Sequence, residues 1–285
     1  MSDAACVACG GALSLFGWRA GYPYFRCASC GTLQLAPLPS KDELAQAYAS
    51  TYASAAHIDA DPEACRRLSR TYYRALLKVL KKRKVAGRVA EVGSGWGGLC
   101  TLLIAKGFQC EGVEPSEKMA AYCQAQGLPV RQGDIALLPQ DTYAALVLAS
   151  VFEHLVDHDA WLAQARARLK SGGLIVSAQP TARFLTFMAQ VLRLGSLRLP
   201  LPQLHQGFCP PWHTVLFSIE GMRRIAERNG FDLIEVRRYP QGRAQGLTGI
   251  VQRLLDAANC VGWLAMRERW PLVIGHIFVL KKTSP

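Results

Sequence analysis

The sequence predicts an α/β protein in which a largely parallel sheet follows a small metal-binding module. Two observations support this prediction. From residue 88 onward, short apolar runs of strand length alternate with helical segments, the order typical of a parallel sheet covered by helices. Ahead of them, four cysteines stand in two CxxC pairs. The 285 residues, 50% of them hydrophobic and 19% charged, suffice for one large domain and a small appendage.

The composition narrows the compartment and the partners. We expect no secretion signal, because residues 1–11 have no basic region followed by an apolar stretch. We expect no membrane span, because no apolar run reaches the required length. Ten cysteines without such a signal indicate a reducing compartment, so we expect a cytoplasmic protein with metal-binding cysteines. The net charge of +12 indicates an acidic partner, which is nucleic acid, a phosphorylated small molecule or a membrane surface.

The N-terminal cysteines form the pattern C-x2-C-x17-C-x2-C. Each CxxC turn supplies two thiolates from one tight loop, and four thiolates complete the tetrahedral shell that zinc prefers. The pattern therefore predicts a zinc ribbon over residues 1–36, with a structural Zn²⁺ and no catalytic role for the metal. The predicted ligands are Cys6, Cys9, Cys27 and Cys30.

Residues 37–84 are expected to form a helical connector. Ser40 followed three residues later by Glu43 is a capping box, which predicts the start of a short helix. Further along, apolar residues at helical spacing predict a second helix that ends near Gly87. The main domain then occupies residues 85–285.

The stretch VAEVGSGWGGLC, residues 89–100, has four glycines where a predicted strand over 88–92 passes into a predicted helix over 96–106. A glycine turn in this position brings a ligand against bare backbone at a helix N-terminus. Gly93 and Gly95 form the G-x-G-x-x-G spacing together with Gly98, and the G-x-G-x-G spacing together with Gly97. Spacing alone therefore indicates a nucleoside-containing cofactor without deciding which one.

Acidic residues after successive strands favour S-adenosylmethionine (SAM) over NAD. Glu114 follows the second strand, where a carboxylate accepts hydrogen bonds from both ribose hydroxyls. Glu91 precedes the glycines, where it can meet the cationic amino group that SAM carries and NAD lacks. Asp134 follows the third strand, where it can accept from an adenine amino group. A fourth apolar strand ends at Ser150, and a fifth follows a helix that we expect to end at the glycine pair 172–173.

The ordered series EVGSGWG, GVEPS, QGDI, ALVLASVFEHL and LKSGGLIVSAQP resembles the class I SAM-dependent methyltransferases, in particular the bacterial small-molecule type. The resemblance covers about residues 85–240. It implies a Rossmann-like sheet of seven strands, the last one antiparallel, with helices on both faces. The terminal GHIFVLKK resembles that last strand. Trp96 departs from the family pattern, which has a small acidic or polar residue there.

The resemblance also implies where the cofactor lies. It places Glu91, Gly93 and Gly95 near the aminocarboxyl group, and Ser150 below the sulfonium. It places the adenine at Asp134 and Ile135, and the ribose at Glu114. The full set of predicted cofactor-binding residues is Glu91, Gly93, Ser94, Gly95, Glu114, Pro115, Asp134, Ile135 and Ser150.

Two histidines are candidates for activating the methyl acceptor. His154 follows the fourth strand, where the methyl group should lie, and is our first candidate for a general base. His213 is the second candidate. The alternative for His154 is a structural role that orients the loop through Glu153. Residues 181–217 form an apolar insertion with interleaved arginines, which suits a lid over a lipid-like, aromatic or phosphorylated small molecule, or a peripheral membrane contact.

Three rival functions remain open at this point. The basic charge and the zinc ribbon also suit an RNA methyltransferase, although no Asn/Asp-Pro-Pro-aromatic element follows the fourth strand. A non-catalytic SAM-binding scaffold would use the ribbon for protein contacts. An NAD(P)-dependent reductase is disfavoured by Glu91 and by the repulsion between Glu114 and a ribose 2′-phosphate.

Overall fold

The computed structural model describes residues 4–53, 61–195, 209–239 and 246–284. Its centre is a seven-stranded sheet in the order β10-β11-β8-β7-β4-β5-β6. The five strands from β8 to β6 run parallel, and β11 runs antiparallel to both of its neighbours. The predicted Rossmann-like sheet with an antiparallel last strand is confirmed. The strands are β4 (Arg88–Val92), β5 (Gln109–Glu114), β6 (Val130–Gln132), β7 (Tyr143–Ala149), β8 (Leu169–Pro180), β10 (Phe231–Arg238) and β11 (Gly275–Lys282).

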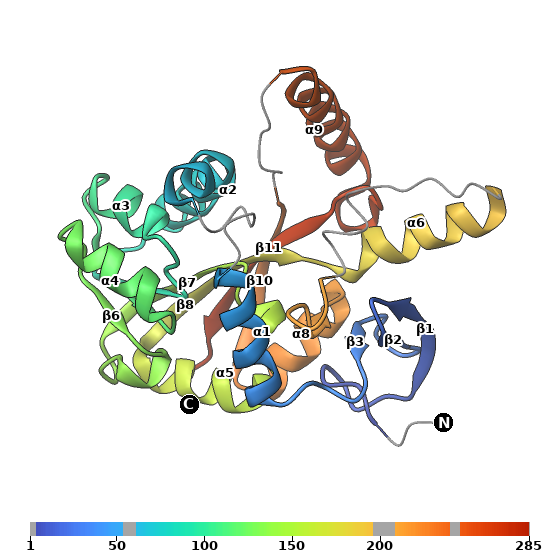
Figure 1. The fold of residues 1–285 in the computed structure, drawn as a ribbon, viewed down its shortest axis with the longest axis horizontal. Coiled ribbons are helices and arrows are strands. Elements are labelled where there is room, and N and C mark those ends of the chain that lie inside the picture. The colour runs from blue at the N-terminus through green and yellow to red at the C-terminus, as the bar shows by residue number, and fades with distance from the viewer. Residues whose placement is uncertain (1–3, 54–60, 196–208, 240–245, 285) are drawn as a thin grey trace.

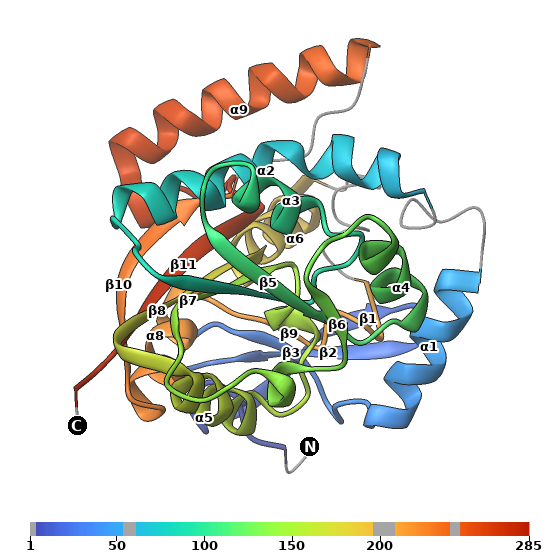
Figure 2. The same ribbon diagram turned by 90° about the vertical axis from the view of Figure 1, so that its left-hand side faces the viewer.

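Helices cover both faces of this sheet (Figures 1 and 2). Successive strand residues point to opposite faces, so Val89 and Val147 pack with one set of helices while Ala90 and Leu146 pack with the other. Each face therefore has its own hydrophobic core. The first face carries α2 (Pro62–Lys82), α3 (Gly98–Ile104) and α4 (Glu117–Ala125), and the second carries α5 (His158–Arg168) and α8 (Ile219–Arg228).

Several element boundaries differ from the predicted ones, and α2 already ends at Lys82, ahead of Gly87. Helix α3 begins at Gly98, because Gly97 has the left-handed φ of 72° and serves as its N-cap. Helix α5 ends at Arg168, ahead of the glycine pair 172–173, and β8 already starts at Leu169. The reason is pairing: Leu169 lies opposite Tyr143 in the sheet, and the glycines fall at the irregularity that follows.

The N-terminal residues form a second, four-stranded sheet. Its first three strands are β1 (Leu13–Arg19), β2 (Tyr22–Cys27) and β3 (Leu33–Leu35), and its fourth is β9 (Val215–Leu216), from the predicted insertion. The ribbon is therefore completed by a strand from a distant part of the chain. It also packs on α8, where Arg228 donates hydrogen bonds to main-chain carbonyls of the first CxxC loop.

The connector consists of α1 (Lys41–Ala53) followed by α2. The capping box is present: the Glu43 N–H donates to Ser40 Oγ at 3.1 Å, and the Ser40 N–H donates to Glu43 Oε2 at 2.6 Å. In Figure 2 the arrowheads of β5 and β6 point toward the side of the molecule on which α1 lies. The connector thus borders the carboxyl edge of the sheet.

Two helices project from the body of the molecule, α6 (Ala182–Gly195) and α9 (Gly246–Met266) (Figure 1). The first follows the carboxyl end of β8, and the second precedes β11, which pairs with that end. Among the described residues, no helix is long and apolar enough to cross a membrane. Helix α9 nevertheless exposes a series of large apolar side chains: Ile250, Val251, Leu254, Leu255, Val261, Leu264 and Met266.

Candidate active site

The glycine turn after β4 takes a backbone form that only glycine adopts readily. Gly93 and Gly95 have φ values of 73° and 53°. A Cβ at Gly93 would lie 2.5 Å from a methyl carbon of Val151, so glycine is needed for the close approach of the two strand ends. A Cβ at Gly95 would meet no atom within 4 Å. The turn is therefore closed toward β7 and open at Gly95, where a ligand can approach the backbone.

Glu114 joins the end of β5 to this turn. Its carboxylate accepts hydrogen bonds from the Gly95 N–H at 2.7 Å and from the Ser116 N–H at 2.9 Å. Burial raises the pKa of Glu114, and these two bonds oppose the shift by stabilising the carboxylate. Pro115 lies between Glu114 and Ser116 in the sequence. The acid is thus fixed beside the open glycine, with acceptor capacity left for hydroxyl groups of a ligand.

Glu91 is buried under the turn, with 1% of its surface exposed. Its Oε2 accepts from the Cys100 N–H at 2.9 Å, within the first turn of α3. Burial raises the pKa of Glu91, as expected for a carboxyl among apolar neighbours. The side chain therefore braces the N-terminus of α3 from the adjacent strand. Ser94, the neighbouring predicted residue, is also buried and donates from Oγ to the Glu91 carbonyl at 3.4 Å.

The next predicted residues lie beyond the ends of β6 and β7. Asp134 is exposed, and its Oδ1 accepts from the Ala136 N–H at 2.8 Å, which caps a short 3-10 helix. Ile135 follows it and is buried. Ser150 follows β7 directly with a left-handed φ of 58°, and its N–H donates to the Ala178 carbonyl on β8. All nine predicted cofactor-binding residues therefore lie at or beside the carboxyl ends of four neighbouring parallel strands.

The two candidate histidines meet directly beyond β7. His154 belongs to the 3-10 helix Phe152–His154, and His213 comes from the segment before β9. Their rings lie 5.1 Å apart between centroids. Burial, followed by the neighbouring imidazole, lowers the pKa of His154 below its usual range, so its ring is uncharged at neutral pH.

Glu153 is the third member of this group. Its side chain is fully buried, and burial raises its pKa to about 8. Its Oε1 lies 3.9 Å from His154 Nε2, beyond hydrogen-bonding distance. Main-chain bonds tie the group together, because the Thr214 N–H and hydroxyl both donate to the Glu153 carbonyl, at 2.9 and 3.0 Å. We call Glu153, His154 and His213 the β7 cluster.

Comparison with known proteins decides the family. Residues 64–236, more than half of the chain, match the family described as "Methyltransferase domain". This chain belongs to the class I SAM-dependent methyltransferases. The expected activity and the expected nucleoside cofactor are thereby confirmed at the level of the family.

Individual relatives agree with this assignment. The methyltransferase is 33% identical over 95 residues to the ubiquinone biosynthesis O-methyltransferase of Paramagnetospirillum magneticum. That match spans 31% of this chain and only 38% of the relative's own length. Curated relatives of this kind are thus matched over less than half of their length.

Solved structures show the same fold at low identity. The Burkholderia thailandensis 1,6-didemethyltoxoflavin-N1-methyltransferase, solved with 1,6-didemethyltoxoflavin and S-adenosylhomocysteine, has a TM-score of 0.54 and 13% identity. The match covers 95% of this chain and 100% of the other. A chain from the complex of the Haloferax volcanii Trm112 methyltransferase activator with a methyltransferase also has a TM-score of 0.54, at 14% identity, covering 80% and 98% of the two chains.

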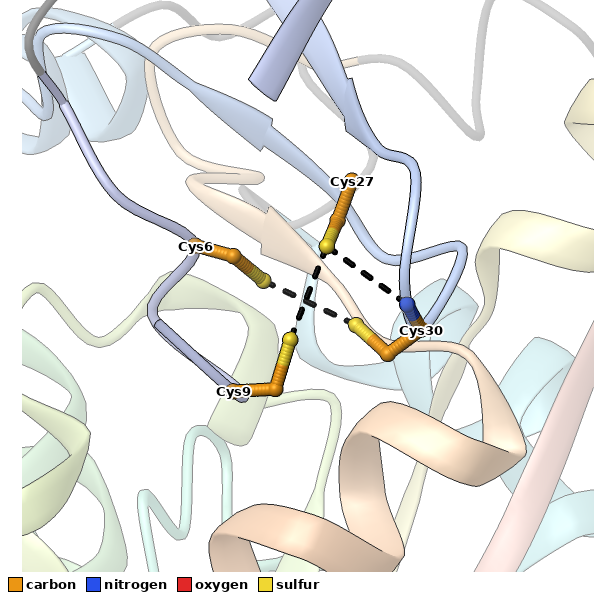
Figure 3. Close-up of side chains that lie close together, drawn as sticks. All are labelled: Cys6, Cys9, Cys27 and Cys30. Atoms are coloured by element: carbon orange, nitrogen blue, oxygen red, sulfur yellow. Dashed lines mark hydrogen bonds between the residues drawn. The ribbon is translucent and has the colours of Figure 1, made fainter. Parts of the chain in front are cut away.

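The four ribbon cysteines of the methyltransferase converge on one point (Figure 3). Cys6 Sγ lies 3.6 Å from Cys30 Sγ, and Cys9 Sγ lies 3.5 Å from Cys27 Sγ. Sulfurs on a tetrahedron with zinc–sulfur bonds of about 2.3 Å stand about 3.8 Å apart, so the set fits a zinc ion. The hydrogen bond between Cys6 and Cys30 lowers the pKa of Cys30 and raises the pKa of Cys6, which favours one thiolate in the pair. These residues could hold a structural Zn²⁺.

Trp96 packs behind the glycine turn. It is buried and meets Tyr122 edge-to-face at 5.1 Å between ring centroids. Arg66 on α2 donates to the Trp96 main-chain carbonyl at 3.2 Å. The Trp96 ring thus packs the turn against α4, while the link to α2 uses the main-chain carbonyl that any residue would supply.

Several site residues were missed from the sequence. Tyr73 on α2 lies over the turn, since a Cβ at Gly98 would come within 2.7 Å of its ring. Its neighbour Tyr72 stacks on Tyr239 at 5.4 Å between ring centroids. In the sequence Tyr72 fits the apolar face of an amphipathic helix, so no local signal distinguishes it from the core. Residues 196–208 of the predicted insertion lie outside the described residues.

Proposed function

We propose that this methyltransferase transfers the methyl group of SAM to a hydroxyl group of a small-molecule acceptor. The observation that carries the proposal is the β7 cluster, a group of two imidazoles and a carboxylate beside Ser150. Class I enzymes of the resembled type hold the sulfonium at this strand end. A nitrogen base there is useful for an oxygen acceptor, which must lose its proton as the methyl arrives.

In this proposal the carboxyl edge of the sheet holds the cofactor. Gly93 and Gly95 border the aminocarboxyl part, Glu114 accepts from the ribose hydroxyls, and the adenine lies between Asp134 and Ile135. The fixed position of Glu114 supports this assignment, because an acid already anchored by two N–H donors loses little freedom on binding. Glu91 and Ser94 support the turn from below.

The chemistry is an in-line displacement. The acceptor oxygen forms a bond to the methyl carbon, the carbon–sulfur bond breaks, and the electron pair stays on sulfur as the neutral thioether of S-adenosylhomocysteine. Positioning of oxygen, methyl and sulfur in one line supplies much of the rate. His154, with His213 beside it, activates the acceptor by drawing off its proton; the lowered pKa of His154 keeps its ring ready to do so.

The acceptor we favour is amphiphilic. Helix α6 follows the carboxyl end of β8, next to Ser150, and α9 precedes β11, which pairs with that end. Helix α9 exposes seven large apolar side chains. An acceptor with a long apolar part would cover some of that surface. The similarity to a ubiquinone biosynthesis O-methyltransferase supports the same choice, within its 38% coverage of that relative.

The zinc ribbon, residues 1–36, has a supporting role in this proposal. Its four cysteines hold one Zn²⁺ that closes the ribbon, and its β3 strand pairs with β9, directly after His213. The described parts of the insertion 181–217 and of the connector 37–84 then border the active site. We propose no direct contact between the ribbon metal and the substrate.

The test is a transfer assay with SAM labelled on its methyl group. The purified protein is incubated with an organic extract of cells and, separately, with total RNA. The proposal expects label in the organic-soluble products, lost when His154→Ala replaces the wild type. Label that appears in RNA and is absent from the extract would contradict the proposal and favour the RNA methyltransferase alternative.

A further inference from the structure

The side chain of Glu153 lacks the partners that a buried carboxyl group needs. None of its surface is exposed, and neither carboxyl oxygen has a hydrogen-bond partner among the described residues. An ionised carboxylate in this position requires a cation, because an unpaired charge in a buried site is strongly destabilising. A protonated carboxyl would not solve the problem, since its O–H would then lack an acceptor.

The imidazoles of His154 and His213 lie beside the carboxyl group of Glu153. One ligand atom each from Glu153, His154 and His213 can be chosen so that all three lie within 4.8 Å of one another. Ligand atoms around a zinc-sized ion, with bonds of about 2.1 Å, stand about 3.4 Å apart in a tetrahedron. The Glu153 Oε1–His154 Nε2 distance of 3.9 Å is close to that value, so small side-chain rotations would close the shell.

The main chain around the cluster is fixed before any ligand arrives. Thr214 bonds the Glu153 carbonyl twice, which sets the segment of His213 against the 3-10 helix of His154. On the other side, the Tyr24 hydroxyl donates to the His213 carbonyl at 2.9 Å. A direct carboxylate–imidazole hydrogen bond would be the simpler arrangement, but the 3.9 Å separation does not form one.

We infer that Glu153, His154 and His213 bind one divalent transition-metal cation, distinct from the ion of the zinc ribbon. Two imidazoles and one carboxylate are the donor set of three-ligand catalytic metal sites, which leave a position open for substrate. The cation would neutralise the charge of Glu153 and would be coordinated by one or both of its carboxylate oxygens. It lies at the end of β7, beside Ser150.

A role for this cation rests on the proposed function. The acceptor hydroxyl would take the open position, and the cation would lower its pKa, so that the proton leaves to solvent as the oxygen attacks the methyl carbon. The carbon–sulfur bond breaks and its electron pair remains on sulfur, as in the uncatalysed displacement. In this arrangement His154 and His213 coordinate the cation through their imidazole nitrogens. The acceptor is then activated by the cation and not by a histidine that acts as a general base.

Cobalt binding measures the site without reference to the acceptor. Protein that retains its ribbon zinc is titrated with Co²⁺ by calorimetry and absorption spectroscopy. We expect one equivalent to bind with the visible bands of nitrogen and oxygen ligands and without the thiolate charge-transfer bands that exchange into the ribbon would give. Glu153→Gln and His213→Asn should each weaken this binding at least about 100-fold.

Glu220→Gln is the matched control, because Glu220 is an exposed acid on α8 that pairs with Arg223 and Arg224. This variant should bind Co²⁺ as the wild type does. The inference is overturned if the wild type takes up no equivalent outside the ribbon, or if Glu153→Gln binds Co²⁺ unchanged. Because the measurement contains no acceptor, a failure of the proposed substrate class leaves its result unaffected.

Discussion

The Tyr24 hydroxyl, on the second strand of the zinc ribbon, donates a hydrogen bond of 2.9 Å to the main-chain carbonyl of His213. Tyr24 is buried, so this bond is shielded from water. It links the N-terminal module to the β7 cluster. The neighbouring bond from the Leu35 N–H to the Thr214 carbonyl, also 2.9 Å, strengthens the link. The ribbon thus holds one wall of the candidate active site.

Tyr24→Phe should therefore affect turnover more than cofactor binding. Loss of one such hydrogen bond is worth about 1 kcal/mol, which corresponds to a fall in kcat of about 5-fold if His213 shifts. The Kd for SAM should stay unchanged. Tyr22→Phe, on the same strand and exposed, is the matched control. Equal kcat values for the Tyr24 variant and the wild type would show that the ribbon does not position His213.

The four cysteines should retain about one zinc per chain in the ribbon. Cys27→Ser combined with Cys30→Ser should remove that zinc and lower the melting temperature, because the thiolates that close the ribbon are lost. Elemental analysis together with zinc release by a thiol-modifying reagent counts the ribbon ion separately from a metal in the β7 cluster. A folded wild type that releases no metal on thiol modification would contradict the zinc assignment.

Glu114→Ala should weaken SAM binding. A carboxylate that accepts from both ribose hydroxyls contributes roughly 2–3 kcal/mol, so the Kd should rise by roughly 30- to 150-fold. Glu114 also anchors the Gly95 N–H, so Glu114→Gln, which keeps one acceptor oxygen, should lose less. Calorimetry with SAM measures both variants. A wild-type Kd for Glu114→Ala would place the ribose elsewhere.

His158 should make the protein less stable in mild acid. Burial lowers the pKa of its ring from 6.5 to about 4. The hydrogen bond of the ring to the Phe152 carbonyl, at 2.9 Å, and the charges of Asp159 and Asp157 oppose this shift with smaller effects. The unfolded chain binds the proton first, so stability is full above pH 6.5 and falls as the pH drops toward 4.

The pH dependence of the free energy of unfolding separates the contribution of His158 from that of other groups. Below about pH 6 the free energy of unfolding of the wild type should fall by up to about 1.4 kcal/mol per pH unit more than that of His158→Phe. Urea unfolding at several pH values gives both slopes. Parallel slopes for the two proteins would mean that His158 is not held neutral by burial.

Local pattern sufficed for the elements that depend on local chemistry. The strand over residues 88–92 and the capping box at Ser40 appear as expected, because apolar runs and caps are decided by neighbours in sequence. The cysteine spacing likewise predicted the convergence of four sulfurs. The first turn of α3 was placed two residues early, since nothing in the sequence shows that Gly97 takes a left-handed φ.

The β7 cluster depended on long-range contacts instead. His154 and His213 were both candidates, yet they meet through contacts between distant segments: the bonds of Thr214 to the Glu153 carbonyl and the pairing of β9 with the ribbon. A strand of two residues, Val215–Leu216, carries no alternation that a sequence can reveal. Glu153 was considered only as a partner of His154, because its complete burial depends on the packing of segments far apart in the chain.

The most direct test of the account is the paired measurement of SAM affinity and turnover for His154→Ala. The account places His154 beside the reacting methyl group and away from the cofactor-binding turn. The Kd for SAM should therefore stay within a few-fold of the wild type, while turnover falls by about 10²–10⁴-fold, the usual cost of losing the group that activates the acceptor. Unchanged turnover, or a loss of SAM binding in place of turnover, would contradict the account.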